Sequence, residues 1–218
     1  MKKFIVLVLC MVLVSVAFAQ KKKIILTTSY GKIEMVLYDK TPKHRDNMLK
    51  LVRQKFYDSI MFHRIIPAFV IQGGDPNSKH AKPGAMLGEG DVGYKIPAEI
   101  NDEYYHRRGA VGMAREDNPE KASSGCQFYI VVGKKITDET LDKLTKNNGR
   151  TFTKEQRDVY KTEGGTPHLD GRYTVFGMVI KGMDVVDTIS KLPRDANDRP
   201  NQDVVMKRVR IKKKFWIF

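Results

Sequence analysis

Apolar and polar residues alternate along several short segments of this chain, and a period of two is the pattern of half-buried β-strands. The first two such segments are residues 24–28 and 32–38, separated by Ser29-Tyr30-Gly31, which has the composition of a tight turn. They predict a β-hairpin at the start of the folded domain. The other strand candidates are spread over the rest of the chain: residues 61–72 with a bend at Pro67, then 109–114, 127–132, 173–180 and 204–213.

Helical spacing of apolar residues occurs at two places between these strands. The first helix is expected to begin at Pro42, with Thr41 as its candidate N-cap. Its apolar positions are Met48, Leu49, Val52 and Phe56. A shorter helix fits residues 183–191 and is stopped by Pro193. Many strands with two helices predict a mainly β domain, a barrel or a sandwich closed by helices, and the glycine-rich connections argue against a parallel α/β sheet.

Residues 134–166 interrupt the strand pattern. Thr137-Asp138-Glu139 and the segment 151–155 both have the composition of a helix start, and Asn147-Asn148-Gly149 between them is typical of a turn. We therefore predict a charged helical insertion, which is either a decorated loop or a surface that docks a partner. Residues 73–95 are rich in Gly, Pro, Asn and Asp and predict a long surface loop.

The composition indicates one soluble globular domain behind an export signal. The chain has 218 residues, 41% of them hydrophobic, and a mean hydropathy of −0.41. Lys2-Lys3, an apolar run at 4–16 and Ala17-Phe18-Ala19 together predict a cleavable signal peptide at 1–19 ahead of a domain at 20–218. The apolar run is shorter than the roughly 20 residues that span a membrane. We expect export to a periplasm, with secretion as the alternative and membrane contact only in transit.

Charge and cysteine content set further limits. The formal net charge of +14 becomes +12 when Lys2 and Lys3 leave with the signal peptide. The basic residues are scattered without an aromatic-interleaved motif, so no specific nucleic-acid partner is predicted, and an anionic surface stays a weaker alternative. Only Cys126 remains after processing, which excludes an intrachain disulfide, and the five histidines lack metal-like spacing. We predict no cofactor and no metal.

A guanidinium and a carboxamide stand inside residues 62–75, a segment that otherwise has the composition of a buried β-ribbon. These groups belong to Arg64 and Gln72. An unpaired amide in apolar surroundings costs roughly 2 to 7 kcal/mol, and a charge costs more, so both groups need partners or a function.

One reaction suits such groups without a nucleophile, a proton shuttle or a metal. Rotation about an X-Pro bond faces a barrier of about 20 kcal/mol, because the nitrogen lone pair is delocalised into the carbonyl. A donor aimed at that nitrogen in the twisted geometry weakens the conjugation. Strand alternation places Arg64, the candidate donor, on one face with Phe62 and Ile66. Cross-strand pairing can bring Gln72, Met113 and Gln127 near it, with the two glutamines to hold the peptide. Candidate walls of an apolar cup are Phe69, Val70, Met113, Tyr129 and Leu169.

Four stretches resemble, in order, the motifs of the cyclophilin-type peptidyl-prolyl cis-trans isomerases. They are residues 62–75, 109–114, 123–130 and 169–177. With the hairpin and both helices, the resemblance covers nearly all of residues 23–213 except the insertion. It implies an eight-stranded antiparallel β-barrel capped by two helices, with the substrate groove on the outside of the barrel.

The resemblance also implies roles for individual residues. Arg64 matches the catalytic arginine that stabilises the twisted prolyl amide. Gln72 and Gln127, which we count in the catalytic set, match positions that hold the peptide, as does Ala114. The other substrate-binding candidates are Phe69, Met113 and Leu169 in the proline pocket, Val70 and Tyr129 where methionine and phenylalanine are familiar, and Arg115, His168 and Tyr173.

The chain departs from the family pattern at the rim of the expected groove. His168 replaces the tryptophan of many eukaryotic members and Tyr173 replaces their nearby histidine, which predicts weaker binding of cyclosporin-class inhibitors. Ala114-Arg115-Glu116 stands where Ala-Asn-Ala is frequent, so charge is expected to alter the preference for residues beside the proline. The sequence thus predicts a monomeric prolyl isomerase for proline-containing unfolded or extended exported proteins. The alternative is a peptide-binding module or holdase that uses the same groove without turnover.

Overall fold

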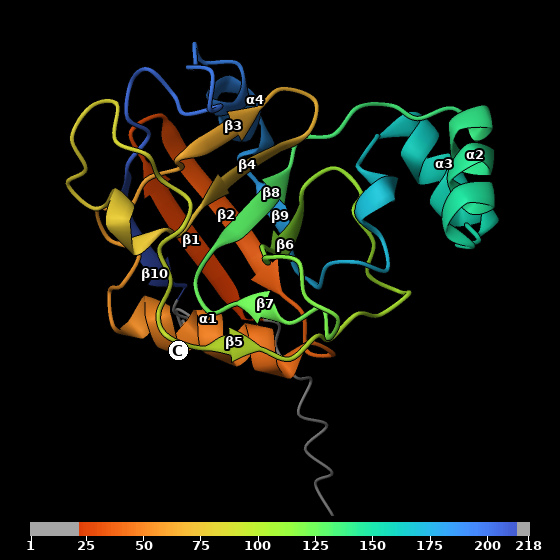
Figure 1. Cartoon of the computed structure of the whole chain (residues 1–218), viewed down its shortest axis with the longest axis horizontal. Helices are drawn as coiled ribbons and strands as arrows, with labels where there is room; N and C mark the ends of the chain where they lie inside the picture. The colour runs from red at the N-terminus through yellow and green to blue at the C-terminus, as the bar shows by residue number, and fades with distance from the viewer. Residues whose placement is uncertain (1–21, 213–218) are drawn as a thin grey trace, which may run out of the picture.

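The computed structural model describes residues 22–212, and its main element is an antiparallel sheet of eight strands (Figure 1). In spatial order the strands are β10 (Met206–Ile211), β1 (Lys23–Thr28), β2 (Gly31–Leu37), β9 (Val175–Lys181), β6 (Ala110–Met113), β8 (Phe128–Val131), β4 (Val70–Gly73) and β3 (Arg64–Ile66). A separate ribbon pairs β5 (Lys95–Ile96) with β7 (Ser123–Ser124). The predicted mainly β, eight-stranded antiparallel fold is confirmed. The predicted signal peptide at 1–19 lies outside the described residues.

The sheet curls into a half-barrel, and its two edges approach each other through the segments that precede β3 and β10. Met61 and Val205 form an isolated antiparallel bridge, and the amide of Phe62 donates to the carbonyl of Val204 at 2.8 Å. The strands β3 and β10 are not themselves paired, so the ladder is open between them. Backbone bonds outside the strands therefore hold the curl.

Four α-helices accompany the sheet within residues 22–212. Two of them, α1 (Pro42–Arg53) and α4 (Met183–Ser190), lie at opposite ends of the sheet (Figure 1), where α1 packs on β9 and β10 and α4 on β2, β3 and β4. Both confirm the predicted helices, although Phe56 packs on the core from beyond the end of α1. The others, α2 (Asp138–Asn148) and α3 (Lys154–Thr162), form the predicted insertion. No helix among the described residues is long and apolar enough to cross a membrane.

The start of α1 is capped by a residue from a distant loop. Thr41 occupies the N-cap position, but its hydroxyl donates to the carbonyl of Tyr38 at 3.4 Å and does not cap the helix. The carboxylate of Glu99 accepts instead from the amides of Lys43 and His44, each at 3.0 Å. The predicted N-cap position of Thr41 is therefore confirmed, but a carboxylate supplied by tertiary structure, and not the Thr41 side chain, satisfies the free amides at the helix start.

Alternation along the strands divides apolar side chains between two faces of the sheet. The inner face carries the main core, which includes Ile71, Phe128 and Ile130. The outer face of the same strands carries a smaller cluster built on Val70, Tyr129 and other residues that extend it: Ala110, Val131 and Val175. The groove side of the sheet thus has an apolar floor of its own.

The insertion has a third, separate core. It consists of Ile136, Leu141, Phe152 and Tyr160. Thr153 and Gln156 form a reciprocal capping box at the start of α3, and Gly149, with φ +69°, ends α2. Figure 1 shows α2 and α3 side by side, projecting from one side of the sheet. The part of the chain that the structure describes also contains two 3₁₀ turns, η1 (Pro76–Ser78) and η2 (Pro167–Leu169).

Candidate active site

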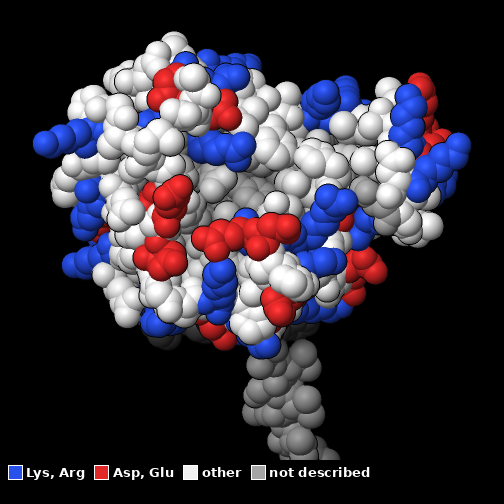
Figure 2. All heavy atoms as spheres, viewed as in Figure 1, with Lys and Arg blue, Asp and Glu red and all other residues white. Residues whose placement is uncertain are grey.

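A pocket of about 220 Å³ lies on the outer face of the sheet, where β6, β8, β4 and β3 are neighbours. Figure 2 shows a hollow near the centre of the molecule with acidic and basic side chains around it. Nine predicted site residues line the pocket: Arg64, Phe69, Val70, Gln72, Ala114, Arg115, Tyr129, Leu169 and Tyr173. We call it the apolar pocket.

The strand register brings these residues together from distant parts of the sequence. Arg64 lies opposite Gln72, Gln72 opposite Tyr129, and Tyr129 opposite Gly112. Directly opposite residues share a face of the sheet, so this row lies on the outer face. Gly112 is required there, because a Cβ atom at that position would overlap the ring of Tyr129. The tyrosine ring therefore lies flat across β6.

A row of polar side chains runs along one side of the apolar pocket. Arg64 Nη1 donates to Gln72 Oε1 at 3.4 Å, and Gln72 Nε2 donates to Gln127 Oε1 at 3.1 Å. Gln127 Nε2 donates in turn to the carbonyl oxygens of Gly88 and Gly90, at 2.7 and 2.8 Å. Gln127 is buried, so these bonds compensate the loss of its hydration. They also fix the direction in which the carboxamide of Gln72 points.

Arg64 is held less tightly than the two glutamines. Its Nε lies 3.7 Å from a carboxylate oxygen of Asp198, which also pairs with Arg194 at 3.0 Å. This contact and the 3.4 Å bond to Gln72 are both long, and 40% of the arginine side chain is exposed. A guanidinium has five N–H donors. Arg64 therefore keeps donors for a ligand that enters the pocket.

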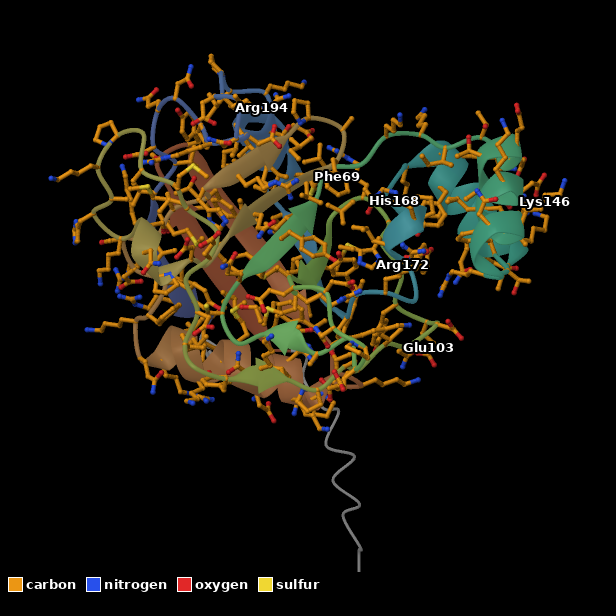
Figure 3. All side chains as sticks on the ribbon, viewed as in Figure 1. Phe69, Glu103, Lys146, His168, Arg172 and Arg194 are labelled. Atoms are coloured by element: carbon orange, nitrogen blue, oxygen red, sulfur yellow. The ribbon has the colours of Figure 1, made fainter. Side chains whose placement is uncertain are left out.

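Aromatic side chains form the walls of the apolar pocket. The rings of Phe69 and His168 stack at 5.5 Å, and Figure 3 shows the two residues close together on the side that faces the insertion. Tyr173 meets Tyr129 edge to face at 6.0 Å, and the guanidinium of Arg115 lies over the ring of Tyr173 at 4.9 Å. Such contacts between flat rings leave few alternative rotamers, so the walls are well defined.

The structure places three predicted residues differently from expectation. Met113 is fully buried in the inner core, since its strand position points it away from the apolar pocket, and the prediction that it lines the pocket is wrong. Phe62 also packs in the inner core because it precedes β3, so it does not share a face with Arg64 and Ile66. His168 is exposed and reaches the pocket only through its stacking on Phe69.

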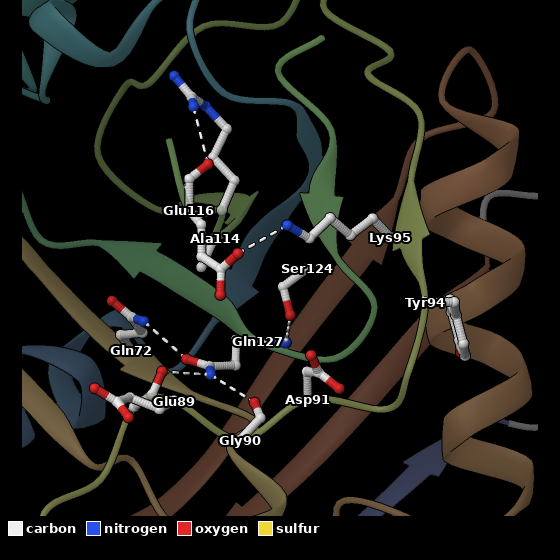
Figure 4. Close-up of a pocket in the computed structure, with 12 residues that line it drawn as sticks. Gln72, Glu89, Gly90, Asp91, Tyr94, Lys95, Ala114, Glu116, Ser124 and Gln127 are labelled. Atoms are coloured by element: carbon white, nitrogen blue, oxygen red, sulfur yellow. Dashed lines mark hydrogen bonds and ion pairs between the residues drawn. The ribbon is translucent and has the colours of Figure 1, made fainter. Parts of the chain in front are cut away.

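A second, smaller pocket of about 100 Å³ adjoins the polar row and contains residues that the sequence reasoning missed (Figure 4). Its lining includes Glu89, Asp91, Tyr94 and Lys95 from the long loop, together with Gln72, Gln127, Ser124, Ala114, Arg115, Glu116, Gly88 and Gly90. We call it the acidic pocket. The motif Gly88-Glu89-Gly90 is visible in the sequence, but only the fold shows that its carbonyls receive Gln127.

The two charged residues that follow Ala114 have different surroundings. Arg115 is only 10% exposed, since it donates to the carbonyls of Arg172 and Glu116 and covers Tyr173. The carboxylate of Glu116 is exposed and pairs with Lys95 at 2.7 Å. The rim charge that a peptide meets is thus mainly that of the acidic residues.

The thiol beside the polar row is inert. Cys126 is fully buried, and burial raises its pKa from 9.0 to about 11, which disfavours the nucleophilic thiolate. Within residues 22–212 no group of three or more His, Cys, Asp or Glu side chains is placed to hold a metal ion. The site therefore offers an apolar cup, a cationic donor and fixed amides, which suit binding and twisting of an extended peptide.

The comparisons with known proteins agree with this chemistry. A family model described as cyclophilin type peptidyl-prolyl cis-trans isomerase/CLD matches residues 23–211. The chain belongs to this family. A Streptococcus pyogenes protein, whose name describes a bifunctional phosphatase/peptidyl-prolyl cis-trans isomerase, is 36% identical over 192 residues, which are 87% of this chain and 38% of that protein. A Staphylococcus epidermidis protein named for the isomerase alone is 31% identical over 188 residues, 86% of this chain and 90% of that protein.

Solved cyclophilin structures share the fold. The crystal structure of a Cryptosporidium parvum cyclophilin type peptidyl-prolyl cis-trans isomerase is 25% identical with a TM-score of 0.65, and the match covers 89% of this chain and 99% of that one. A second structure of the same protein, determined in the presence of the dipeptide Ala-Pro, has a TM-score of 0.63 and covers 88% and 99%. Family membership confirms the resemblance inferred from the four motifs and the predicted class of enzyme.

His63, the neighbour of this cyclophilin's Arg64, predicts how stability changes with pH. It is buried, neither ring nitrogen has a hydrogen-bond partner within residues 22–212, and burial lowers its pKa from 6.5 to about 4. Between pH 6.5 and about pH 4 the His63 ring is protonated in the unfolded chain but stays neutral in the folded chain. The free energy of unfolding is therefore highest above pH 6.5, and it falls by roughly 2 to 3 kcal/mol as the pH drops between these two values.

We expect His63→Asn to flatten the dependence of unfolding free energy on pH between 4 and 6.5, measured by urea denaturation. His80→Asn is the matched control. His80 is exposed and has φ +61°, a backbone conformation that asparagine also adopts, so this variant should leave the pH dependence of the unfolding free energy unchanged. Equal slopes for wild type and His63→Asn would contradict the assignment of this acid sensitivity to His63.

Proposed function

We propose that this cyclophilin isomerises X-Pro bonds in unfolded or extended segments of exported proteins, with Arg64 as the donor to the prolyl nitrogen. The observation that carries the proposal is the partly exposed, loosely held guanidinium beside the apolar pocket. The structure determined with Ala-Pro concerns a relative, and it supports a proline-containing ligand for this groove.

The proposed mechanism follows from what each group can do to a twisted amide. The prolyl ring occupies the cup formed by Phe69, Tyr129 and Leu169. Gln72, which Gln127 orients, holds the preceding peptide. In the planar amide the nitrogen lone pair is delocalised and accepts poorly, whereas in the twisted amide it becomes available to Arg64. The donor therefore binds the transition state better than the ground state, which is the condition for lowering the barrier.

Replacing Arg64 tests this mechanism. We expect Arg64→Ala to lower kcat/KM by about 10²- to 10³-fold, the effect of removing one donor that acts mainly in the transition state. The measurement is cis-to-trans relaxation of a short X-Pro peptide. Arg53→Ala, at an exposed position in the last turn of α1, should keep wild-type activity and controls for loss of positive charge.

The outcomes of this experiment separate the enzyme from a holdase. If wild type accelerates relaxation and folded Arg64→Ala does not, the mechanism stands. If both proteins accelerate it equally, the role of Arg64 is wrong. If wild type binds the peptide but leaves its relaxation unchanged, the groove serves binding alone, as in the alternative function.

The acidic pocket suggests a preference among substrates. Glu89 and Asp91 line it beside the Lys95–Glu116 pair, which nearly cancels its own charge. We expect peptides with Lys beside the Ala-Pro unit to be turned over about 3- to 10-fold faster than those with Glu at low salt, and the difference to shrink as salt is added. The double variant Glu89→Lys, Asp91→Lys should reverse the order, while Glu139→Lys on α2 should not. Identical rates for both peptides would contradict this preference.

Export is the part of the proposal that rests on the sequence alone. The charged, apolar and small-residue regions of residues 1–19 support it. N-terminal sequencing of the protein purified from its natural source should begin at Gln20, and the protein should be released with the periplasmic fraction. A native chain that begins at Met1 would contradict export by this signal.

A further inference from the structure

A line of buried hydrogen bonds connects the insertion with a wall of the apolar pocket. Tyr160, on α3, donates from its hydroxyl to Asp170 Oδ2 at 2.6 Å. The other carboxylate oxygen of Asp170 lies 2.7 Å from Nδ1 of His106, and Nε2 of His106 lies 2.8 Å from the hydroxyl of Tyr129. All four residues are buried, with at most 7% of any of them exposed. We call this set the tyrosine line.

The direction of each proton along the tyrosine line follows from its acceptors. Asp170 Oδ1 also accepts from the backbone amide of His106 at 2.8 Å, so the carboxylate lies on the Nδ1 side as an acceptor. When the ring of His106 is neutral, Nδ1 donates to Asp170 and Nε2 accepts from the hydroxyl of Tyr129. Burial is the main cause that raises the pKa of both tyrosines well above 10, so both hydroxyls keep their protons.

Tyr129 is the member of the tyrosine line that touches the apolar pocket. Its ring stacks on His106 at 6.0 Å, meets Tyr173 edge to face and lies against Gly112. A phenylalanine would supply the same apolar wall without a hydroxyl to bury. The buried O–H needs its acceptor, and that acceptor restricts how the ring can tilt.

Asp170 links the line to a second pocket wall. It directly follows Leu169, which lines the apolar pocket from the turn η2. The carboxylate binds both the ring and the backbone of His106, so it ties η2 to the segment that leads into β6. Movement of Asp170 would therefore shift Leu169 and Tyr129 together.

The end of the insertion is locked against the same segment. Thr166 donates from its amide to the carbonyl of His106 at 2.8 Å, and Arg108 donates from its amide to Gly164 at 2.9 Å. A Cβ atom at Gly165 would overlap the backbone of His106 and crowd the ring of Tyr160. The close contact between Gly165 and His106 leaves no room for a side chain. It therefore fixes the position of the insertion on this segment, and from there Tyr160 contacts Asp170.

We infer that Tyr160, Asp170 and His106 are positioning residues of the isomerase, through which the insertion holds the Tyr129 and Leu169 walls of the apolar pocket. The inference rests on the proposed function in that it takes this pocket as the proline site. It assigns to residues 134–166 a part in shaping the site, in place of simple decoration.

A double-mutant cycle tests the coupling along the tyrosine line. Tyr160→Phe removes one hydroxyl and keeps the ring. We expect it to lower kcat/KM by about 3- to 10-fold, mainly through KM, because a misplaced wall weakens binding before and during twisting. In a Tyr129→Phe background the same change should cost less than in the wild type, because the route through the Tyr129 hydroxyl is already absent and only the effect on Leu169 remains.

The matched control is Tyr105→Phe. Its ring packs on that of Tyr160 at 5.5 Å, but its hydroxyl is outside the tyrosine line, so activity should change less than about twofold. Urea unfolding of each variant shows that the assays use folded protein. A Tyr160→Phe effect of equal size in both backgrounds, or no effect in wild type, would overturn the inference.

Binding measurements keep this test separate from the test of the proposed function. If wild type binds an Ala-Pro peptide without turning it over, the proposed catalysis fails, and the cycle is measured on the dissociation constant of that peptide. Coupling between Tyr160 and Tyr129 in that constant would still support the positioning role. Additive effects would contradict it whether or not the protein is active.

Discussion

The pairing of β4 with β8 determines which side chains of these two strands face the groove. Val70 lies opposite Val131 and Gln72 opposite Tyr129 on the outer face, while Ile71 and Ile130 meet on the inner face. A shift by one residue would exchange the two faces and put Gln72 into the core. Gly74 helps to set the register, because its φ of +102° and the close approach of the Cys126 carbonyl exclude any side chain there. The polar row exists only in this register.

Buried polar groups border the outer face of the sheet, and distant segments satisfy them. Gln127 depends on carbonyls of the long loop, and His106 depends on Asp170 beyond the insertion. An unpaired group at either position would lose its hydration without compensation. The long loop therefore helps to hold the polar row, although it does not belong to the sheet.

The sequence predicts those features whose cause is local. The first hairpin has alternating residues around a glycine turn, and α3 has its capping box within one turn. The prediction that Arg64, Gln72 and Gln127 lie close together came from the resemblance to a family, because their spacing in the sequence alone does not establish it. The remainder depends on contacts between residues far apart. Thr41 is a residue type that commonly caps helices. The backbone amides at the start of α1 are instead bound by Glu99, which is 55 or more residues away in the sequence.

Met113 illustrates the same limit within a single strand. Its apolar character suits a pocket wall and a core equally well, and only the register shows that it points inward while Gly112 faces Tyr129. The tyrosine line had no sequence signal at all, since His106, Tyr160 and Asp170 are separated by loops and a helix. Single polar residues in such segments are ordinarily exposed, so burial was the decisive observation.

The loose hold on Arg64 is consistent with a donor that must follow a moving atom. A short bidentate ion pair would occupy its N–H groups and would have to break before the nitrogen could be reached. Contacts of 3.4 and 3.7 Å keep the guanidinium at the pocket, and Asp198 divides its charge between Arg64 and Arg194. A prolyl ring that displaces water from the pocket lowers the local dielectric constant, which strengthens the field of the arginine at the nitrogen. In the proposed mechanism the apolar walls therefore contribute to the chemistry as well as to binding, because the arginine donor acts more strongly when substrate covers them.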